Sequence, residues 1–274
     1  IHNEMVRAFS LLAAAVPLVI LWRLARSRGK SSRTPSNKRT PKRLILVRHG
    51  ESQGNIDHTI YEHTPDNALH LTERGWEQAL SAGNALRTII SDETVCFFVS
   101  PYVRTRETLH AIARAFGGLS RLRWIEDPRI REQDFGNFQD PERTIKFKEE
   151  RKRFGSFFYR FPDGGESAAD VFDRVSSFME SMVRHWENHT DVENYVLVIH
   201  GVTISAFLMR FFKYSVDEFD EYENFTNCEM AVLERSEEGR LKLNYCIRNE
   251  RCVPEQTERA RRRSATQCRE MRYE

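Results

Sequence analysis

Residues 44–52 read LILVRHGES, a continuous apolar run that ends abruptly in charged and polar residues. Four successive apolar residues are typical of a short strand that is buried on both faces of a sheet. Similar short runs occupy residues 95–99, 122–125 and 195–199. The sequence therefore predicts four strands of this kind, and three of them are followed directly by polar or charged side chains.

Helical patterns separate these strands. Thr72 is a suitable N-cap, and apolar residues recur at helical spacing in residues 72–90, 101–116, 166–188 and 202–212. Two further strands are expected at residues 230–233 and 241–247, joined by a Glu-Glu-Gly turn. Strands that alternate with helices predict an α/β fold. We expect one domain with a doubly wound, mainly parallel sheet and helices on both of its faces.

The charge of the chain is distributed unevenly. Among its 274 residues, the first 43 carry ten Lys or Arg and one acidic residue, whereas residues 44–250 carry 25 basic and 35 acidic residues. An acidic body argues against a nucleic-acid-binding domain, whose electrostatic footprint would be basic. With 40% hydrophobic residues and a mean hydropathy of −0.59, a polytopic membrane protein and a wholly disordered chain are also excluded.

The N-terminal region contains an apolar run, AFSLLAAAVPLVILW, at residues 8–22. Fifteen helical residues span about 22 Å, and several basic residues follow them. Positive charge after the run predicts that the rest of the chain stays in the cytosol. We therefore expect a membrane anchor or targeting segment at residues 1–26, with a mitochondrial transit peptide, a cleaved signal and a segment without function as alternatives.

The remaining divisions follow from composition. Residues 27–42 are a polar, basic linker rich in Ser, Thr and Pro, and residues 43–250 form the folded domain. Residues 251–274 form an Arg-rich tail. The five cysteines include no C-x-x-C pair and no zinc-type spacing with histidine, which favours free thiols and gives no sign of a metal site.

Charged groups gather where the strands end. Arg48 and His49 follow the first strand, Arg104 lies one turn beyond the second, and His200 follows the strand at residues 195–199. Glu132 lies in a further connection. Because a doubly wound fold places the carboxyl ends of its strands around one crevice, these side chains are expected to form an anion site with acid and base groups.

Phosphoryl transfer through histidine is the chemistry that fits such a site. A neutral imidazole nitrogen can attack phosphorus in line, and arginines can hold the equatorial oxygens of the transition state. A carboxylic acid must protonate the leaving alkoxide, whose pKa is otherwise far above 7. This chemistry requires neither a metal nor an organic cofactor.

Five ordered motifs of the chain resemble the histidine phosphatase superfamily, the phosphoglycerate mutase-like fold. They are LVRHGES with the following GN (46–55), LTERGWEQA (71–79), SPYVRTRET (100–108), REQDFG (131–136) and VIHG (198–201). The resemblance implies that His49 is the nucleophile and Glu132 the proton donor. It also implies that the transferred phosphate is bound by Arg48, Asn55, Arg104 and His200.

The resemblance leaves three functions open. A phosphomonoester hydrolase acting on a small-molecule or protein phosphoester is favoured, because Val202-Thr203 replaces the Asn-Ser pair of mutases and PDGGES at residues 162–167 resembles phosphatase branches. A cofactor-dependent phosphoglycerate mutase is the first alternative, since residues 146–160 are as basic as a bisphosphate site. A membrane-tethered adaptor with dispensable activity is the second.

Overall fold

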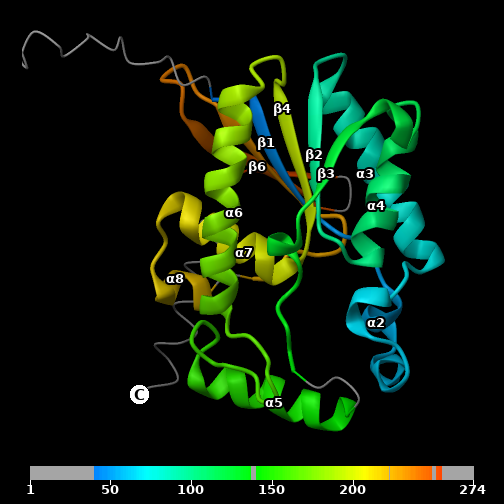
Figure 1. Ribbon diagram of the computed structural model, residues 1–274, viewed down its shortest axis with the longest axis vertical. Coiled ribbons are helices and arrows are strands. Elements are labelled where there is room, and N and C mark those ends of the chain that lie inside the picture. The colour runs from blue at the N-terminus through cyan, green and yellow to red at the C-terminus, as the bar shows by residue number, and fades with distance from the viewer. Residues whose placement is uncertain (1–39, 137–139, 222, 249–250, 255–274) are drawn as a thin grey trace, which may run out of the picture. The chain divides into compact units, whose positions relative to one another are not determined.

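The computed structural model of the chain describes residues 40–136, 140–221, 223–248 and 251–254. A seven-stranded sheet has the strand order β3-β2-β4-β1-β5-β6-β7 (Figure 1). The first four of these pair in parallel and the last three antiparallel. The strands are β1 (Arg43–Arg48), β2 (Val95–Val99), β3 (Arg123–Glu126), β4 (Asn194–Ile199), β5 (Met230–Arg235), β6 (Leu241–Arg248) and β7 (Arg251–Pro254).

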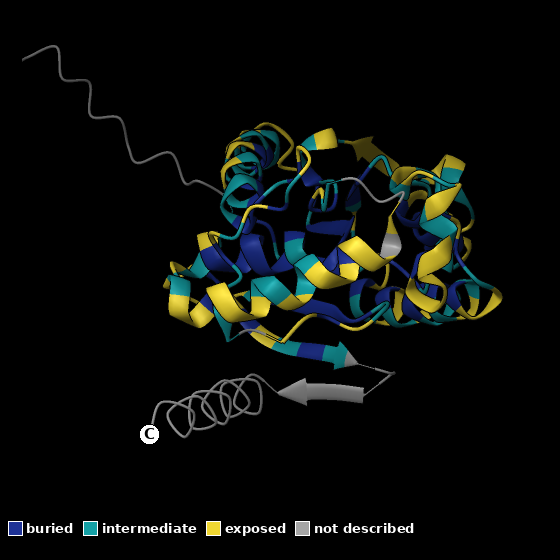
Figure 2. Ribbon diagram, turned by 90° about the horizontal axis from the view of Figure 1, so that it is seen from below, coloured by how far each residue is buried: buried dark blue, intermediate teal, exposed yellow. Residues whose placement is uncertain are grey.

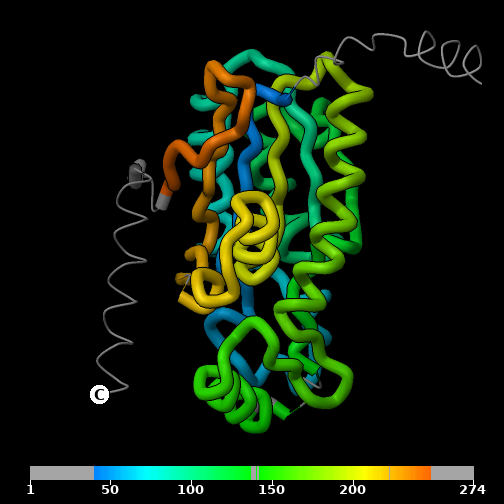
Figure 3. The backbone as a smooth tube through the Cα atoms, turned by 90° about the vertical axis from the view of Figure 1, so that its left-hand side faces the viewer, coloured from blue at the N-terminus to red at the C-terminus, as the bar shows by residue number. Residues whose placement is uncertain are grey.

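Helices cover both faces of the sheet. One face packs on α3 (Glu73–Ile90) and α4 (Val103–Arg114), and the other on α6 (Ala168–Asn188) and α7 (Gly201–Phe212), followed by α8 (Val216–Asp220). Figure 3 shows α6 and α7 lying in front of the strands. The predicted doubly wound α/β fold, with helices on both faces of its sheet, is therefore confirmed.

Strand β1 shows why its sequence is apolar throughout. Leu44 and Leu46 belong to the core under α6 and α7, whereas Ile45 and Val47 belong to the core under α3 and α4. All four side chains are fully buried. Successive side chains of a strand point to opposite faces, so a strand covered on both faces needs apolar residues at every position.

Short elements carry the loops at one end of the sheet. They are α2 (Gln53–Ile56), η1 (His58–Glu62), η2 (Asp66–Ala68) and η4 (Pro128–Ile130), while η3 (Leu119–Arg121) precedes β3. Helix α5 (Pro141–Phe154) crosses the same end as α2 (Figure 1). Figure 2 looks at this end and shows that many residues of α5 are exposed.

Several sequence predictions differ from the structure in detail. Strand β7 extends the sheet to Pro254, four residues beyond the predicted end of the domain. Strand β3 forms as expected, but its residues are exposed because it lies at the edge of the sheet. Helix α8 and the 3₁₀ turns were not predicted, since elements of three to five residues leave no periodic pattern.

The predicted N-terminal segment, residues 1–26, and most of the predicted linker lie outside the described residues. The same holds for residues 255–274 of the predicted tail. Within the part of the chain that the structure describes, no helix combines the length and the apolar character needed to cross a membrane.

Candidate active site

The candidate site lies at the carboxyl ends of β1, β2 and β4. Pairing of β1 with β4 places Arg48 opposite Ile199, so that His49 and His200 follow neighbouring strands. Their ring centroids are 5.2 Å apart. Arg104 comes from the first turn of α4, and Glu132 from the connection after η4. Parallel pairing thus brings together the groups that the sequence placed at strand ends.

His49 is a buried, neutral imidazole. Its Nδ1 lies 2.7 Å from the carbonyl oxygen of Gly50, which can only accept a hydrogen bond, so Nδ1 carries the proton. The other nitrogen, Nε2, therefore keeps its lone pair. Burial, together with the positive charges of Arg104 and Arg48, holds the pKa of His49 well below its usual value of 6.5. At neutral pH the ring is available as a nucleophile.

Helices α3 and α4 both support the loop that carries His49. The amide of Gly50 donates to Oγ1 of Thr108 at 3.0 Å, and the amide of Glu51 donates to Oε1 of Gln78 at 2.9 Å. Gly75 lies so close that a Cβ there would come within 2.0 Å of the carbonyl oxygen of Glu51. Backbone packing of this kind fixes the loop rigidly in place.

The two arginines have different partners. Arg104 is 4% exposed, and both of its terminal nitrogens donate to Asp66. Arg48 donates from Nη1 to the carbonyl oxygen of Phe225, and burial lowers the pKa of its guanidinium. Among the described residues, no partner lies within hydrogen-bonding distance of the buried Nε of Arg48. That nitrogen is able to donate to an anion.

His200 is fully buried and hydrogen-bonded through one nitrogen. Its Nε2 lies 2.7 Å from Oγ of Ser100, while its Nδ1 meets no partner among the residues that the structure describes. Burial and the charge of Arg104 hold the pKa of His200 well below 6.5. A neutral His200 therefore offers one unpaired nitrogen beside His49.

The surroundings of Glu132 favour its protonated form more than water does. It is 8% exposed, and burial raises its pKa above the usual value, against the opposing effect of Arg104. Its Oε1 accepts a hydrogen bond from the amide of Gln133 at 3.0 Å. By contrast, Asp134 is exposed and accepts from the amide of Gly136, so the two neighbouring acids lie in different surroundings.

Asn55 lies at the rim of the site. Its side chain is exposed, and its Oδ1 accepts hydrogen bonds from the amide of Ser52 at 3.0 Å and from Nδ2 of Asn227 at 3.2 Å. The same Asn227 nitrogen donates to the carbonyl oxygen of His49. The structure therefore leaves Asn55 exposed, unlike the other five predicted residues, and connects it to the His49 backbone.

Sequence analysis did not identify several residues around this group. Asp66 pairs with Arg104, and Lys148 and Arg151 of α5 interact electrostatically with Glu132. Burial lowers the pKa of Lys148, and the neighbouring Arg151 adds to this effect. The basic character of residues 146–160 was the available signal for the two cations, but it could not distinguish solvated side chains from inward-facing ones.

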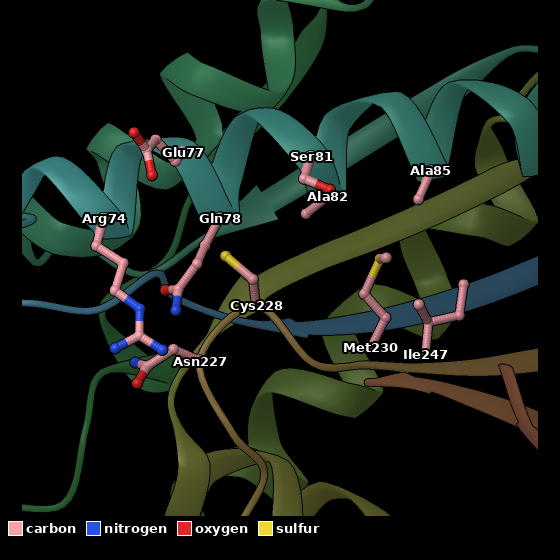
Figure 4. A pocket seen from close by; sticks show the side chains of 10 residues that line it. All are labelled: Arg74, Glu77, Gln78, Ser81, Ala82, Ala85, Asn227, Cys228, Met230 and Ile247. Atoms are coloured by element: carbon pink, nitrogen blue, oxygen red, sulfur yellow. The ribbon is translucent and has the colours of Figure 1, made fainter. Parts of the chain in front are cut away.

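A separate pocket of about 340 Å³ lies between α3 and the β5–β6 part of the sheet (Figure 4). Its walls include Gln78 and Asn227, both of which hydrogen-bond to the loop of His49. Of the described residues that line it, none belongs to the six predicted site residues. Nor do the described His, Cys, Asp and Glu side chains form a group of three able to hold a metal ion.

Two histidines, two arginines and a buried acid at the carboxyl ends of an α/β sheet supply the positive charge and the acid and base groups that a phosphoester-binding protein needs. Comparison with known proteins identifies the family. Residues 44–247 match the family model of the histidine phosphatase superfamily (branch 1). The chain belongs to this superfamily.

Individual relatives carry names of different activities. Phosphoglycerate mutase-like protein AT74 of Arabidopsis thaliana is 49% identical over 222 residues, covering 77% of this chain and 70% of the relative. Broad-range acid phosphatase DET1 of Saccharomyces cerevisiae is 28% identical, and the match covers 72% of this chain and 86% of the relative. The structure of a mycobacterial glucosyl-3-phosphoglycerate phosphatase in complex with VO3 is similar, with a TM-score of 0.57 and 25% identity. The match covers 74% of this chain and 97% of that chain.

Proposed function

We propose that the chain is a phosphomonoester hydrolase that acts through a phosphohistidine at Nε2 of His49. The observation that carries this proposal is the tautomer of His49, because a proton held on Nδ1 by Gly50 leaves the lone pair on Nε2. Relatives named as phosphatases support hydrolysis rather than another transfer reaction.

The first half-reaction transfers the phosphoryl group. Donors from Arg48, Arg104 and His200 bind the non-bridging oxygens of the ester, and Asn55 contacts them from the rim. Nε2 of His49 attacks phosphorus as the bond to the ester oxygen breaks. Glu132 gives its proton to that oxygen, so the product leaves as a neutral alcohol. Arginine supplies the positive charge that this step needs.

The second half-reaction regenerates the site. The Glu132 carboxylate accepts a proton from water as the water oxygen attacks phosphorus, and the bond between phosphorus and Nε2 breaks. Inorganic phosphate is released and His49 returns to its neutral form. Glu132 thus acts as an acid and then as a base, and its raised pKa suits the first of these roles.

The test is to trap the intermediate. Full-length protein mixed with a labelled phosphoester and denatured in alkali should carry phosphate that is stable to base and labile to acid. His49→Ala should lose both the label and the turnover, whereas His63→Ala, in an exposed residue of the nearby loop, should retain both. Label on serine or threonine, or near-normal turnover in His49→Ala, would exclude the proposal.

A mutase is the second candidate, and a specific observation favours it. The cations of Lys148 and Arg151 lie within electrostatic reach of Glu132, where a second phosphate of a bisphosphate would need positive charge. Incubation with 3-phosphoglycerate, with and without 2,3-bisphosphoglycerate, separates the two functions. A mutase would form 2-phosphoglycerate only when primed, whereas a hydrolase would release inorganic phosphate in both cases.

Membrane attachment is a further proposal, which rests on sequence alone. The apolar run at residues 8–22 and the basic residues after it support an anchor with the catalytic domain facing the cytosol. Full-length protein should then remain in the membrane pellet after carbonate extraction, and a truncated protein beginning at Thr40 should stay in the supernatant. Protection of the catalytic domain from protease added to intact organelles would contradict this topology and favour import into mitochondria.

A further inference from the structure

Asp66 holds the guanidinium of Arg104 from two sides. Nη1 of Arg104 donates to the carbonyl oxygen of Asp66 at 2.6 Å and to Oδ1 at 3.1 Å, and Nη2 donates to Oδ2 at 3.2 Å. The two side chains are only 5% and 12% exposed. Two guanidinium nitrogens that bind the two oxygens of a carboxylate could bind two phosphoryl oxygens in the same way.

Two anions cannot share these nitrogens at low cost. Asp66 occupies the edge of the guanidinium that Nη1 and Nη2 form, so a phosphoryl group that binds this edge must displace the carboxylate. The two negative charges would also repel each other in a buried site. The buried Nε of Arg48 and Nδ1 of His200, by contrast, have no hydrogen-bond partner among the described residues. Phosphate can therefore reach those two groups directly but meets competition at Arg104.

Asp66 has partners other than Arg104. Asp66 begins the three-residue turn η2 rather than a long helix. The positive charge of Lys148 interacts with Asp66 from α5, and the phenol of Tyr61 forms a hydrogen bond to the same carboxylate. A carboxylate displaced from Arg104 would still have a cation and a donor beside it.

We infer that the Asp66 carboxylate competes with the phosphoryl group for Arg104, so that a bound substrate displaces it and its return expels inorganic phosphate. This inference rests on the proposed function only in taking Arg104 as a phosphoryl ligand. Asp66 acts through Arg104 and does not touch the reacting atoms. The apparent affinity for phosphate falls in proportion to the fraction of molecules in which Arg104 is free of Asp66.

Binding of inorganic phosphate to the full-length protein, measured by calorimetry, tests this inference. Asp66→Asn removes the charge at nearly constant shape and should tighten phosphate binding by about tenfold, the value expected if Asp66 occupies Arg104 in about nine molecules of ten. In turnover, KM should fall, and kcat should fall as product release slows. A residue that merely supported the loop or aligned Arg104 would change phosphate affinity in the opposite direction.

Asp57→Asn is the matched control, because Asp57 accepts a 2.8 Å hydrogen bond from the amide of Thr59 in the same loop and is exposed. Its phosphate affinity should equal that of the wild type. Unchanged or weaker phosphate binding in Asp66→Asn would overturn the inference. Tightening in both variants would also overturn it, since loosening of the loop would then be the cause.

Amide hydrogen exchange of the unaltered protein gives a second test, which does not depend on a variant that folds. Phosphate should speed exchange in residues 66–69 if it releases Asp66, and slower exchange there would overturn the inference. Failure of the proposed function is distinguishable, because calorimetry needs no turnover. If phosphate competes with Asp66 but no ester is hydrolysed, only the hydrolase proposal is wrong. If esters are hydrolysed but phosphate does not compete with Asp66, only the role of Asp66 is wrong.

Discussion

Arg174 donates a hydrogen bond of 3.0 Å from its Nη2 to the carbonyl oxygen of Glu132. Its Nη1 donates to the carbonyl oxygens of Arg129 and Arg131 at 2.7 and 2.8 Å, and the same guanidinium pairs with Glu166 at 3.0 Å. The Arg174 side chain of α6 therefore fixes the backbone of the segment that carries Glu132. The position of the acid thus depends on a helix that contributes none of the six predicted site residues.

Arg174→Ala should consequently disable the acid. The carbonyl oxygens of Arg129 and Glu132 would lose this donor, and Glu166 would lose one of its two arginine partners. Breaking a buried pair typically costs about 3–5 kcal/mol of folding stability. Turnover of alkyl phosphates should fall more than turnover of nitrophenyl phosphate, whose leaving group needs little protonation. Steady-state kinetics with both substrates and thermal unfolding measure the two effects.

Arg184→Ala is the control for Arg174→Ala, since Arg184 lies on the same helix, is exposed and donates a 3.0 Å hydrogen bond to Oγ of Ser181. It should leave both substrates and the unfolding temperature nearly unchanged. An equal loss for alkyl and nitrophenyl phosphates in Arg174→Ala would contradict a specific effect on Glu132.

The pH dependence follows from two opposite pKa shifts. Catalysis needs neutral His49, whose pKa lies well below 6.5, so activity should fall only when the pH drops through that lowered value. It also needs protonated Glu132, whose pKa lies above 4.5, so activity on alkyl phosphates should fall as the pH rises through that raised value. The profile of kcat/KM, which reports the pKa values of the free enzyme, should therefore be bell-shaped.

Glu132→Gln separates the two limbs of this profile. Removing the titrating acid should abolish the alkaline limb and slow alkyl phosphates strongly, while the acid limb set by His49 remains. With nitrophenyl phosphate the alkaline limb should be shallow even in the wild type, because its leaving group departs without a proton. If Glu132→Gln kept the alkaline limb, the titration behind that limb would belong to a group other than Glu132.

The close approach of α3 to the catalytic loop predicts a strong effect at Gly75. In Gly75→Ala the new Cβ would meet the carbonyl oxygen of Glu51 at 2.0 Å, and neither backbone can yield without moving the loop. Overpacking of this kind costs about 1–3 kcal/mol, and kcat should fall with the displacement of His49. Asn84→Ala, at an exposed position of the same helix, should change neither unfolding nor kcat.

Prediction from sequence succeeded where a residue's neighbours follow from a regular pattern. The apolar run of β1 indicates burial on both faces, and parallel pairing then brings His49 to His200 without further information. Asp66 could not be found in this way. Its contact with Arg104 joins residues 38 positions apart through a short 3₁₀ turn, and neither hydrophobic periodicity nor strand order specifies such a contact.

Helix α5 is a second case in which the sequence pattern does not predict the contacts of a side chain. Its sequence is basic and only weakly amphipathic, so the pattern predicts a solvated helix as readily as one with inward-facing cations. Only the tertiary structure shows that Lys148 and Arg151 interact with Glu132. Five of the six predicted site residues, by comparison, follow from their positions near strand ends, and these five lie together in the fold.

Ser100 should control the tautomer of His200. Its Oγ lies 2.7 Å from Nε2 and 3.5 Å from the amide of Tyr102, which can only donate, so the hydroxyl can give its own proton to Nε2 and keep the imidazole proton on Nδ1. In Ser100→Ala that preference is lost, and kcat/KM should fall about tenfold as the Nδ1 donor to the phosphoryl group weakens. Nitrogen NMR of the His200 ring should show the change of tautomer directly. Ser176→Ala, which removes a hydroxyl bonded only to a helix carbonyl, is the control, and an unchanged ring spectrum in Ser100→Ala would refute the assignment.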